Sequence, residues 1–129
     1  MKNKKYTGAQ IFTKSLKDNK IDTIFGYTGG TVMNLFDEIE KDNKIKFVMS
    51  RHEQGAAFMA QGYTRASGKI APVIATSGPG ILNTVTAIAD AKMDSVPMLV
   101  VSGQVPQEVI GTDAFQETDV LGVMYPITK

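Results

Sequence analysis

The sequence contains no cysteine and a single histidine, His52. Without cysteine the chain can have neither a disulfide, nor a thiol nucleophile, nor a thiolate metal site. A single histidine also rules out a His–His metal pair within the chain, and it leaves no catalytic dyad except one shared with another chain. We therefore predict that the chain holds no metal site of its own.

Long hydrophobic runs and an excess of one charge are missing as well. No apolar run approaches the roughly 20 residues that span a bilayer, and the basic start is followed by Tyr6–Gln10 rather than by an apolar signal core. The 14 basic and 13 acidic residues are interspersed, and only Lys2, Lys4 and Lys5 form a basic cluster. These features predict a cytoplasmic protein that has neither a membrane nor a nucleic acid as partner.

The composition that remains is that of an ordinary globular domain. The 129 residues are 43% hydrophobic and 21% charged, which is enough for one buried core and too little for two. No repeat, low-complexity stretch or linker divides them, so we expect a single domain over residues 1–129. The seven methionines, among them Met33, Met49, Met59 and Met98, are expected to fill gaps in that core.

Hydrophobic periodicity alternates between the helical and the strand repeat along the chain. The pattern predicts helices at about 7–19, 31–41, 53–67 and 81–93, and strands at about 23–27, 45–49, 70–76 and 98–102. Residues 103–115 have the composition of a loop, and the last twelve residues fit either a helix or a loop. Alternating strands and helices with short connections predict an α/β fold, a three-layer doubly wound arrangement around a mainly parallel sheet.

Ligands of such folds bind beyond the carboxyl ends of the strands. Four segments follow the four predicted strands there, namely Tyr27–Gly30, Arg51–Glu53, Ser77–Gly80 and Gly103–Pro106. Two of these turns could cradle a phosphate at a helix start, or they could be tight turns that need glycine. Neither has the G-x-G-x-x-G spacing or a Walker lysine, which favours tight turns.

Glu53, at the predicted start of a helix, also has two interpretations. An acidic residue there stabilises a helix by about 0.3–1 kcal/mol through the helix dipole. Alternatively, the small residues Gly55, Ala56 and Ala57 let another group pack closely against this helix start. In a crevice between apolar side chains, the pKa of a carboxyl rises into the range that suits proton transfer. His52 beside it is expected to be an ordinary exposed histidine.

Five segments, in this order and at these intervals, resemble the large subunit of the acetolactate (acetohydroxyacid) synthase family. They are Phe25–Gly30, Arg51–Ala57, Thr76–Gly80, Asp90–Pro97 and Gly111–Glu117. The resemblance covers the chain from about residue 7 to residue 129. It implies the pyrimidine domain of the thiamine-diphosphate-binding fold, incomplete at its C-terminal edge. It also implies decarboxylation of pyruvate and condensation with a second 2-oxo acid, in branched-chain amino acid biosynthesis.

The resemblance also implies roles for individual residues. Glu53 would hydrogen-bond N1′ of the cofactor's aminopyrimidine ring as the catalytic acid, and Gln116 would act with it near the reacting centre. Further cofactor-binding residues would be Tyr27, Thr28, Gly29, Gly30, Thr76, Pro79 and Asn83. Substrate-channel residues would be Pro106, Ala114 and Phe115.

Enzymes of this family bind Mg²⁺ and FAD in domains that lie outside this chain, and the Gly-Asp-Gly motif that holds the metal is absent here. We therefore expect a fragment of a longer enzyme, inactive alone. The resemblance implies a homodimer or higher oligomer, with which a regulatory subunit can associate. Two alternatives remain open: a pyrimidine-binding subunit of a split thiamine-diphosphate decarboxylase of 2-oxo acids, and a truncated domain without enzymatic activity.

Four positions depart from the family pattern. Thr28 stands where the family usually has proline, Thr31 where it has alanine, and Ile81-Leu82 where Ala-Thr is common. Because Thr31 and Ile81 are larger than alanine, both are expected to change the dimensions of the cofactor pocket.

Overall fold

The computed structural model describes residues 5–129, so Lys2 and Lys4 of the basic start lie outside the described residues. The four strands are β1 (Thr23–Gly26), β2 (Lys46–Met49), β3 (Pro72–Ala75) and β4 (Leu99–Ser102). The α-helices are α1 (Gly8–Asp18), α2 (Met33–Glu40), α3 (Glu53–Ser67), α4 (Pro79–Leu82), α5 (Val85–Met93) and α6 (Val120–Met124). Three 3-10 turns complete the list: η1 (Gly30–Val32), η2 (Gln107–Val109) and η3 (Tyr125–Ile127).

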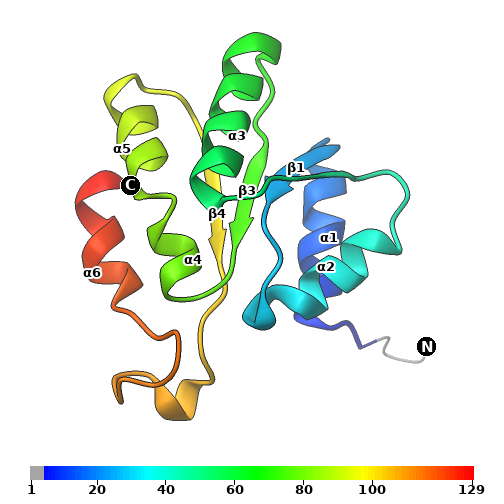
Figure 1. Cartoon of the computed structure of the whole chain (residues 1–129). Coiled ribbons are helices and arrows are strands. Elements are labelled where there is room, and N and C mark those ends of the chain that lie inside the picture. The colour runs from blue at the N-terminus through cyan, green and yellow to red at the C-terminus, as the bar shows by residue number, and fades with distance from the viewer. Residues whose placement is uncertain (1–4) are drawn as a thin grey trace.

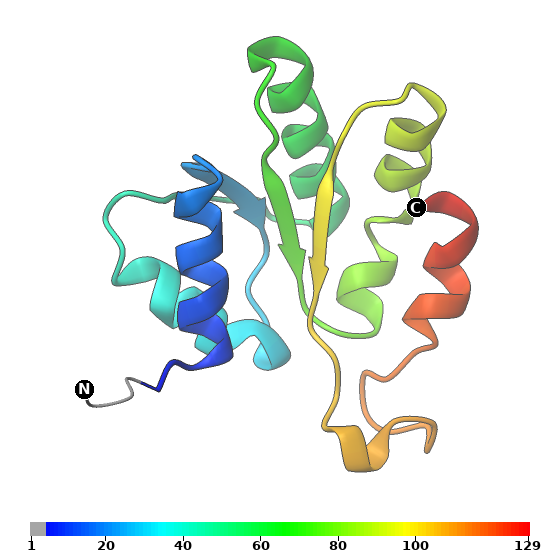
Figure 2. The same cartoon turned by 180° about the vertical axis from the view of Figure 1, so that it is seen from behind.

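The strands form one parallel sheet in the order β2-β1-β3-β4. Helices α1 and α2 cover one face of it, and α3 and α5 cover the other (Figures 1 and 2). Successive residues of the central strands point to opposite faces. Ile24 and Ile74 pack in the core on the α1/α2 side, whereas Phe25 and Val73 pack on the α3/α5 side. The predicted α/β fold with three layers is confirmed.

Local sequence signals place the ends of two helices correctly. At α1, the Thr7 side chain accepts a hydrogen bond from the Gln10 amide and the Gln10 side chain accepts one from the Thr7 amide, which together form a capping box. At α3, the helix ends on Gly68 with φ 71°, a left-handed conformation that favours glycine. These caps fix the start of α1 at Gly8 and the end of α3 at Ser67.

The helix predicted over residues 81–93 is wrong in one respect, because the structure has two helices there. α4 ends at Leu82 and α5 begins at Val85. Between them, the Thr84 hydroxyl donates to the Ile81 carbonyl at 2.6 Å, and the Thr84 amide donates to the same oxygen at 3.0 Å. A threonine that bonds the preceding turn in this way competes with the regular helical ladder. The break turns Asn83 out of both helices.

Two expectations about side chains are corrected. Met33, Met49 and Met59 do not fill the core, since they are 59%, 61% and 37% exposed. Ile81 does not narrow a cofactor pocket, because it is 1% exposed and packs in a hydrophobic cluster with Ala75, Ile88 and Met124. Both errors arise because hydrophobicity along the sequence does not reveal which face of an element meets the core.

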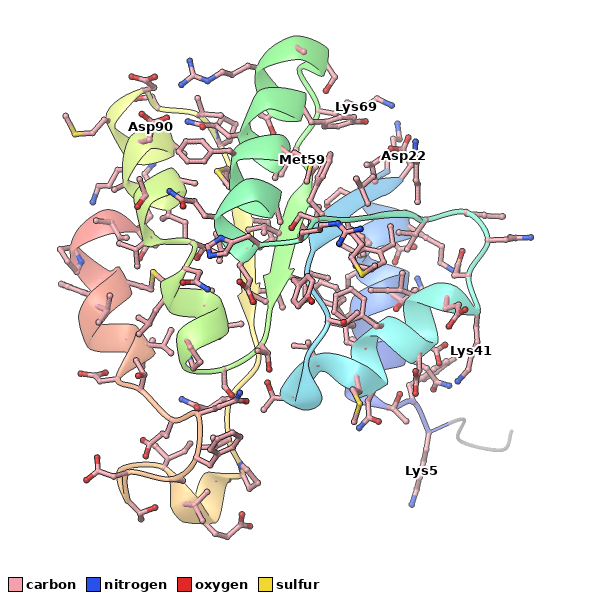
Figure 3. The ribbon with its side chains drawn as sticks, in the orientation of Figure 1. Lys5, Asp22, Lys41, Met59, Lys69 and Asp90 are labelled. Atoms are coloured by element: carbon pink, nitrogen blue, oxygen red, sulfur yellow. The ribbon has the colours of Figure 1, made fainter. Side chains whose placement is uncertain are left out.

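The edge of the sheet at the amino ends of the strands is held by ion pairs. Lys69, just before β3, donates to the Asp22 carboxylate, just before β1, at 3.2 Å (Figure 3). This hydrogen bond lowers the pKa of Asp22 below its ordinary value and raises the pKa of Lys69. In the described part of the chain, no helix combines the length and apolar character needed to cross a bilayer.

Candidate functional site

The strand order makes the carboxyl ends of β1 and β3 the switch point of the sheet. These strands are neighbours, but the chain leaves β1 toward α2 on one face and leaves β3 toward α4 and α5 on the other (Figure 1). Where two adjacent connections part to opposite faces, their ends leave a gap between them, and ligands of doubly wound folds bind there. The topology therefore marks the junction of β1 and β3 as the candidate site.

Close backbone packing shapes this junction. Gly29, in the turn after β1, lies so near Thr76 at the end of β3 that a side chain on Gly29 would collide with the Thr76 side chain. Gly80, at the start of α4, approaches the same threonine, and a Cβ there would lie 2.6 Å from Thr76 Cγ2. Glycine is needed at both positions because the space beside Thr76 is too small for a side chain.

Glu53 brings a carboxylate to the junction as the first residue of α3. Its side chain is buried, and Asn83 Nδ2 donates to its Oε2 at 2.9 Å. The other oxygen, Oε1, lies 3.4 Å from the position of a Cβ on Gly80. Within residues 5–129, Asn83 supplies the only hydrogen bond to this carboxylate. One oxygen is therefore held by the protein, and the other can accept a hydrogen bond from a ligand.

The start of α3 is itself fixed by its neighbours. His52 caps the helix, with its Nδ1 accepting the Gln54 amide hydrogen at 3.2 Å. The Ser50 hydroxyl donates to the His52 carbonyl at 2.6 Å. His52 is exposed, as expected, but its capping role could not be recognised because histidine is rarely counted among capping residues.

A distant segment reaches the site through Gly78. This glycine has φ 57°, and a side chain on it would collide with the backbone carbonyl of Gln116. Gln116 also has a left-handed backbone, with φ 58°. The segment 103–119, which extends beyond the carboxyl ends of the strands (Figure 2), is therefore packed against the end of β3 at this point.

The predicted site residues fall into two groups. The structure brings together Glu53, Asn83, Thr76 and Gly29, and the turn that contains Gly29 also carries Tyr27, Thr28 and Gly30. Pro79 is the first residue of α4, next to Gly78.

The second group lies on the segment 103–119. Pro106 directly precedes η2, Ala114 is half-buried, and Phe115 is 87% exposed. None of the hydrogen bonds in the described part of the chain joins these three residues to Glu53, so their proposed role remains a prediction. Thr31 and Ser77 were both expected near the site, but the hydrogen bond between them could not be predicted, because it depends on the strand order.

No group of three or more histidine, aspartate or glutamate side chains in residues 5–129 could hold a metal ion. Two hollows of the surface lie away from Glu53. One, of about 490 Å³, lies between α1 and α2, and the other, of about 910 Å³, lies beside α5 and β4. The chemistry of the junction therefore depends on one carboxylate and its hydrogen-bond partners.

Comparison with known proteins shows what this arrangement is similar to. The family described as "Thiamine pyrophosphate enzyme, N-terminal TPP binding domain" matches residues 6–123.

The chain is 52% identical over 123 residues to the mitochondrial acetolactate synthase catalytic subunit of Saccharomyces cerevisiae, covering 95% of this chain and 18% of that protein. It is 47% identical over 126 residues to the acetolactate synthase isozyme 1 large subunit of Escherichia coli, covering 98% and 22%. The acetolactate synthase large subunit of Lactococcus lactis is 50% identical over 123 residues, covering 95% and 21%. The chain thus spans about a fifth of the length of these relatives.

Proposed function

Because this chain belongs to the thiamine pyrophosphate enzymes, as their N-terminal TPP-binding domain, we propose that it forms the pyrimidine-binding part of an acetolactate synthase. The proposed reaction is decarboxylation of pyruvate followed by condensation with a second 2-oxo acid. The observation that carries the proposal is the Glu53 carboxylate, buried at the junction of β1 and β3 with one oxygen unpaired. The relatives at 47–52% identity support the choice of reaction.

The residues at the junction suit an aminopyrimidine ring. Glu53 Oε1 would hold the proton at N1′ of the ring, while Asn83 keeps the carboxylate oriented through Oε2. Gly29 and Gly80 let the turns after β1 and β3 pack directly on Thr76, and Glu53 Oε1 lies beside Gly80. Thiamine diphosphate, when bound, supplies the electron sink for loss of CO₂ from a 2-oxo acid. The share of this chain is to orient the ring and to hold one proton.

A chimera tests the role of Glu53. The N-terminal part of the E. coli large subunit that matches this chain is replaced by this chain, and acetolactate formation from pyruvate is measured. We expect an active chimera, and we expect Glu53→Gln to lower kcat by about 10²–10⁴-fold, because the amide cannot take the proton.

The matched control is Glu40→Gln, which changes an exposed carboxylate on α2. It should leave kcat within about twofold of the unsubstituted chimera, since surface substitutions rarely have large effects. Melting temperatures of both variants show whether the fold is kept. Survival of most of the activity in a folded Glu53→Gln variant would refute the proposed function.

For the whole protein we propose Mg²⁺ and FAD as further cofactors, both bound outside this chain. The length of the relatives supports this, because the chain covers only 18–22% of them. We also propose a cytoplasmic location. The lack of cysteine supports it, since small secreted domains commonly depend on disulfides. Subcellular fractionation of the producing cells tests the location.

We further propose that the whole protein is an oligomer in which α3 meets a second copy. The outer face of α3 carries Gly55, Phe58, Met59, Gly62 and Ala66, all exposed. Phe58 is 40% and Met59 37% exposed, whereas the outer face of a surface helix is normally polar. A Cβ on Gly55 or Gly62 would meet nothing within 4 Å, so another helix could approach closely there.

Sedimentation velocity of the chimera tests this interface. Gly62→Arg should convert the oligomer to smaller species, because a long charged side chain would stand in the contact. Gly8→Arg is the control, since Gly8 also has open space around it but begins α1. Equal sedimentation of the Gly62→Arg variant and the unsubstituted chimera would exclude α3 as the contact.

A further inference from the structure

The hydroxyl group of Thr31 lies where the ends of three strands meet. Thr31 belongs to η1, just after the turn that follows β1. Its Oγ1 accepts the amide hydrogen of Ser77, beyond the end of β3, with an N···O distance of 3.1 Å. After β4, Gly103 packs so closely on Thr31 that a side chain there would collide with Oγ1. This one hydroxyl therefore touches the segments that follow β1, β3 and β4.

Thr31 and Thr76 form a reciprocal pair. Their Oγ1 atoms lie 2.9 Å apart, and the Thr31 amide donates to Thr76 Oγ1 at 3.4 Å. Each hydroxyl oxygen thus accepts one backbone N–H, and the two oxygens share one hydroxyl hydrogen. Because three hydrogen bonds converge on two oxygens, neither side chain can rotate about χ1 without breaking at least one of them.

The rotamer of Thr76 decides which group it turns toward Glu53. With Oγ1 directed at Thr31, the Thr76 methyl carbon lies on the side of Gly80, 2.6 Å from the position of a Cβ there. Glu53 Oε1 lies 3.4 Å from the same position. The methyl group and Glu53 Oε1 therefore both lie beside Gly80. A hydroxyl in place of the methyl group would bring a hydrogen-bond donor to the same side of Gly80 as this oxygen.

We propose that Thr31 is a positioning residue for this site. Its hydroxyl holds the Thr76 hydroxyl at the junction of β1 and β3, so that Thr76 presents its methyl group beside Gly80 and Glu53 Oε1 stays available to a ligand. The burial of Thr76, which is 8% exposed, supports this, because a buried hydroxyl keeps the partner that it has. The part of the proposal that concerns the ligand rests on the proposed function.

The first test uses the full chain without cofactor. Thr31→Val removes the hydroxyl at nearly constant shape, and Thr31→Ser keeps the hydroxyl. In the valine variant, the χ1-dependent couplings and the methyl shift of Thr76 should change, and the Ser77 amide should exchange on the order of tenfold faster, having lost its acceptor. The serine variant should match the parent.

Unchanged couplings and exchange in the valine variant would overturn the proposal. Should that variant not fold, Thr31→Cys replaces it, since a thiol is a weak hydrogen-bonding group.

The second test measures binding of thiamine diphosphate with Mg²⁺ to the chimera by calorimetry. Thr31→Val should weaken binding on the order of tenfold, the value of about one hydrogen bond, and Thr31→Ser should not. A changed Thr76 rotamer without these affinity effects overturns the proposal. If the unsubstituted chimera does not bind the cofactor, the proposed function fails, while the first test still decides how Thr76 is held.

Discussion

At the scale of single residues, the candidate site depends on where side chains are absent as much as on where they are present. Glu53 would be an ordinary acidic residue at a helix start if Gly80 and Gly29 did not bring two backbone turns against Thr76. Asn83 adds direction, because its bond to Oε2 leaves Oε1 as the oxygen on the side of Gly80. The position of this carboxylate is thus fixed by four neighbours, none of which is charged.

A substitution of Gly78 can measure how much the fold depends on a missing side chain. Gly78→Ala should lower the free energy of unfolding of the chain by about 1–3 kcal/mol, because φ is 57° and the new Cβ would collide with the Gln116 carbonyl. Urea denaturation measures the change. Gly8→Ala is the control, with open space around it, and it should stay within about 0.5 kcal/mol of the parent. A loss of equal size in both variants would contradict the packing of Gln116 on Gly78.

At the scale of the elements, α3 connects the site to the rest of the fold. Its inner face packs Ala56, Ala57 and Ala60 against the sheet, and these small residues let the helix lie close to β1 and β3. Its first residue is Glu53, so whatever fixes the first turn of α3 also fixes the carboxylate. The helix start therefore decides where the carboxylate lies as well as how the helix begins.

Removal of the cap on α3 should loosen that first turn. His52→Ala should lower the free energy of unfolding by about 0.5–2 kcal/mol, the usual cost of a lost N-cap, because the Gln54 amide loses its acceptor. His52→Asn keeps a side-chain acceptor and should recover most of the loss. Urea denaturation gives the stability, and hydrogen exchange of the Gln54 amide reports on the turn itself. Fast exchange in the alanine variant alone is the expected result, and equal exchange in all three proteins would exclude a capping role.

At the scale of the whole molecule, the proposed site accounts for only one end of the cofactor. Under the proposed function Glu53 would bind the ring, whereas residues 5–129 contain no cluster of side chains that could hold a metal ion at the diphosphate. One hydrogen bond to a charged group contributes about 1.5–3 kcal/mol, which is far from a micromolar affinity.

The chain alone should therefore bind thiamine and thiamine diphosphate equally weakly, with or without Mg²⁺. Isothermal titration calorimetry of the chain with both ligands measures this. The comparison of the two ligands is its own control, because they differ only in the diphosphate. Micromolar binding of thiamine diphosphate that depends on Mg²⁺ would contradict this prediction, because it would show that the chain itself binds the metal and the diphosphate.

The sequence alone was sufficient for the class of the fold and for most of its elements. Strand and helix periodicities, the capping box at Thr7 and the glycine at Gly68 act over a few residues, so they can be recognised without knowing what lies next to them. The same holds for Glu53 as the start of α3. The glycine-rich turns at the strand ends were also visible, because parallel strands place all such turns at one edge.

Only the tertiary structure decided which of these turns meet. The order β2-β1-β3-β4 puts Thr31 against Thr76, 45 residues away in sequence, and no local pattern contains that pairing. It also decided that Ile81 points into the core and that Met33 and Met49 point out, since burial depends on what covers an element. A site built from the ends of several strands is non-local by nature. Its members can be listed from the sequence, but their contacts follow from how the strands are ordered in the sheet.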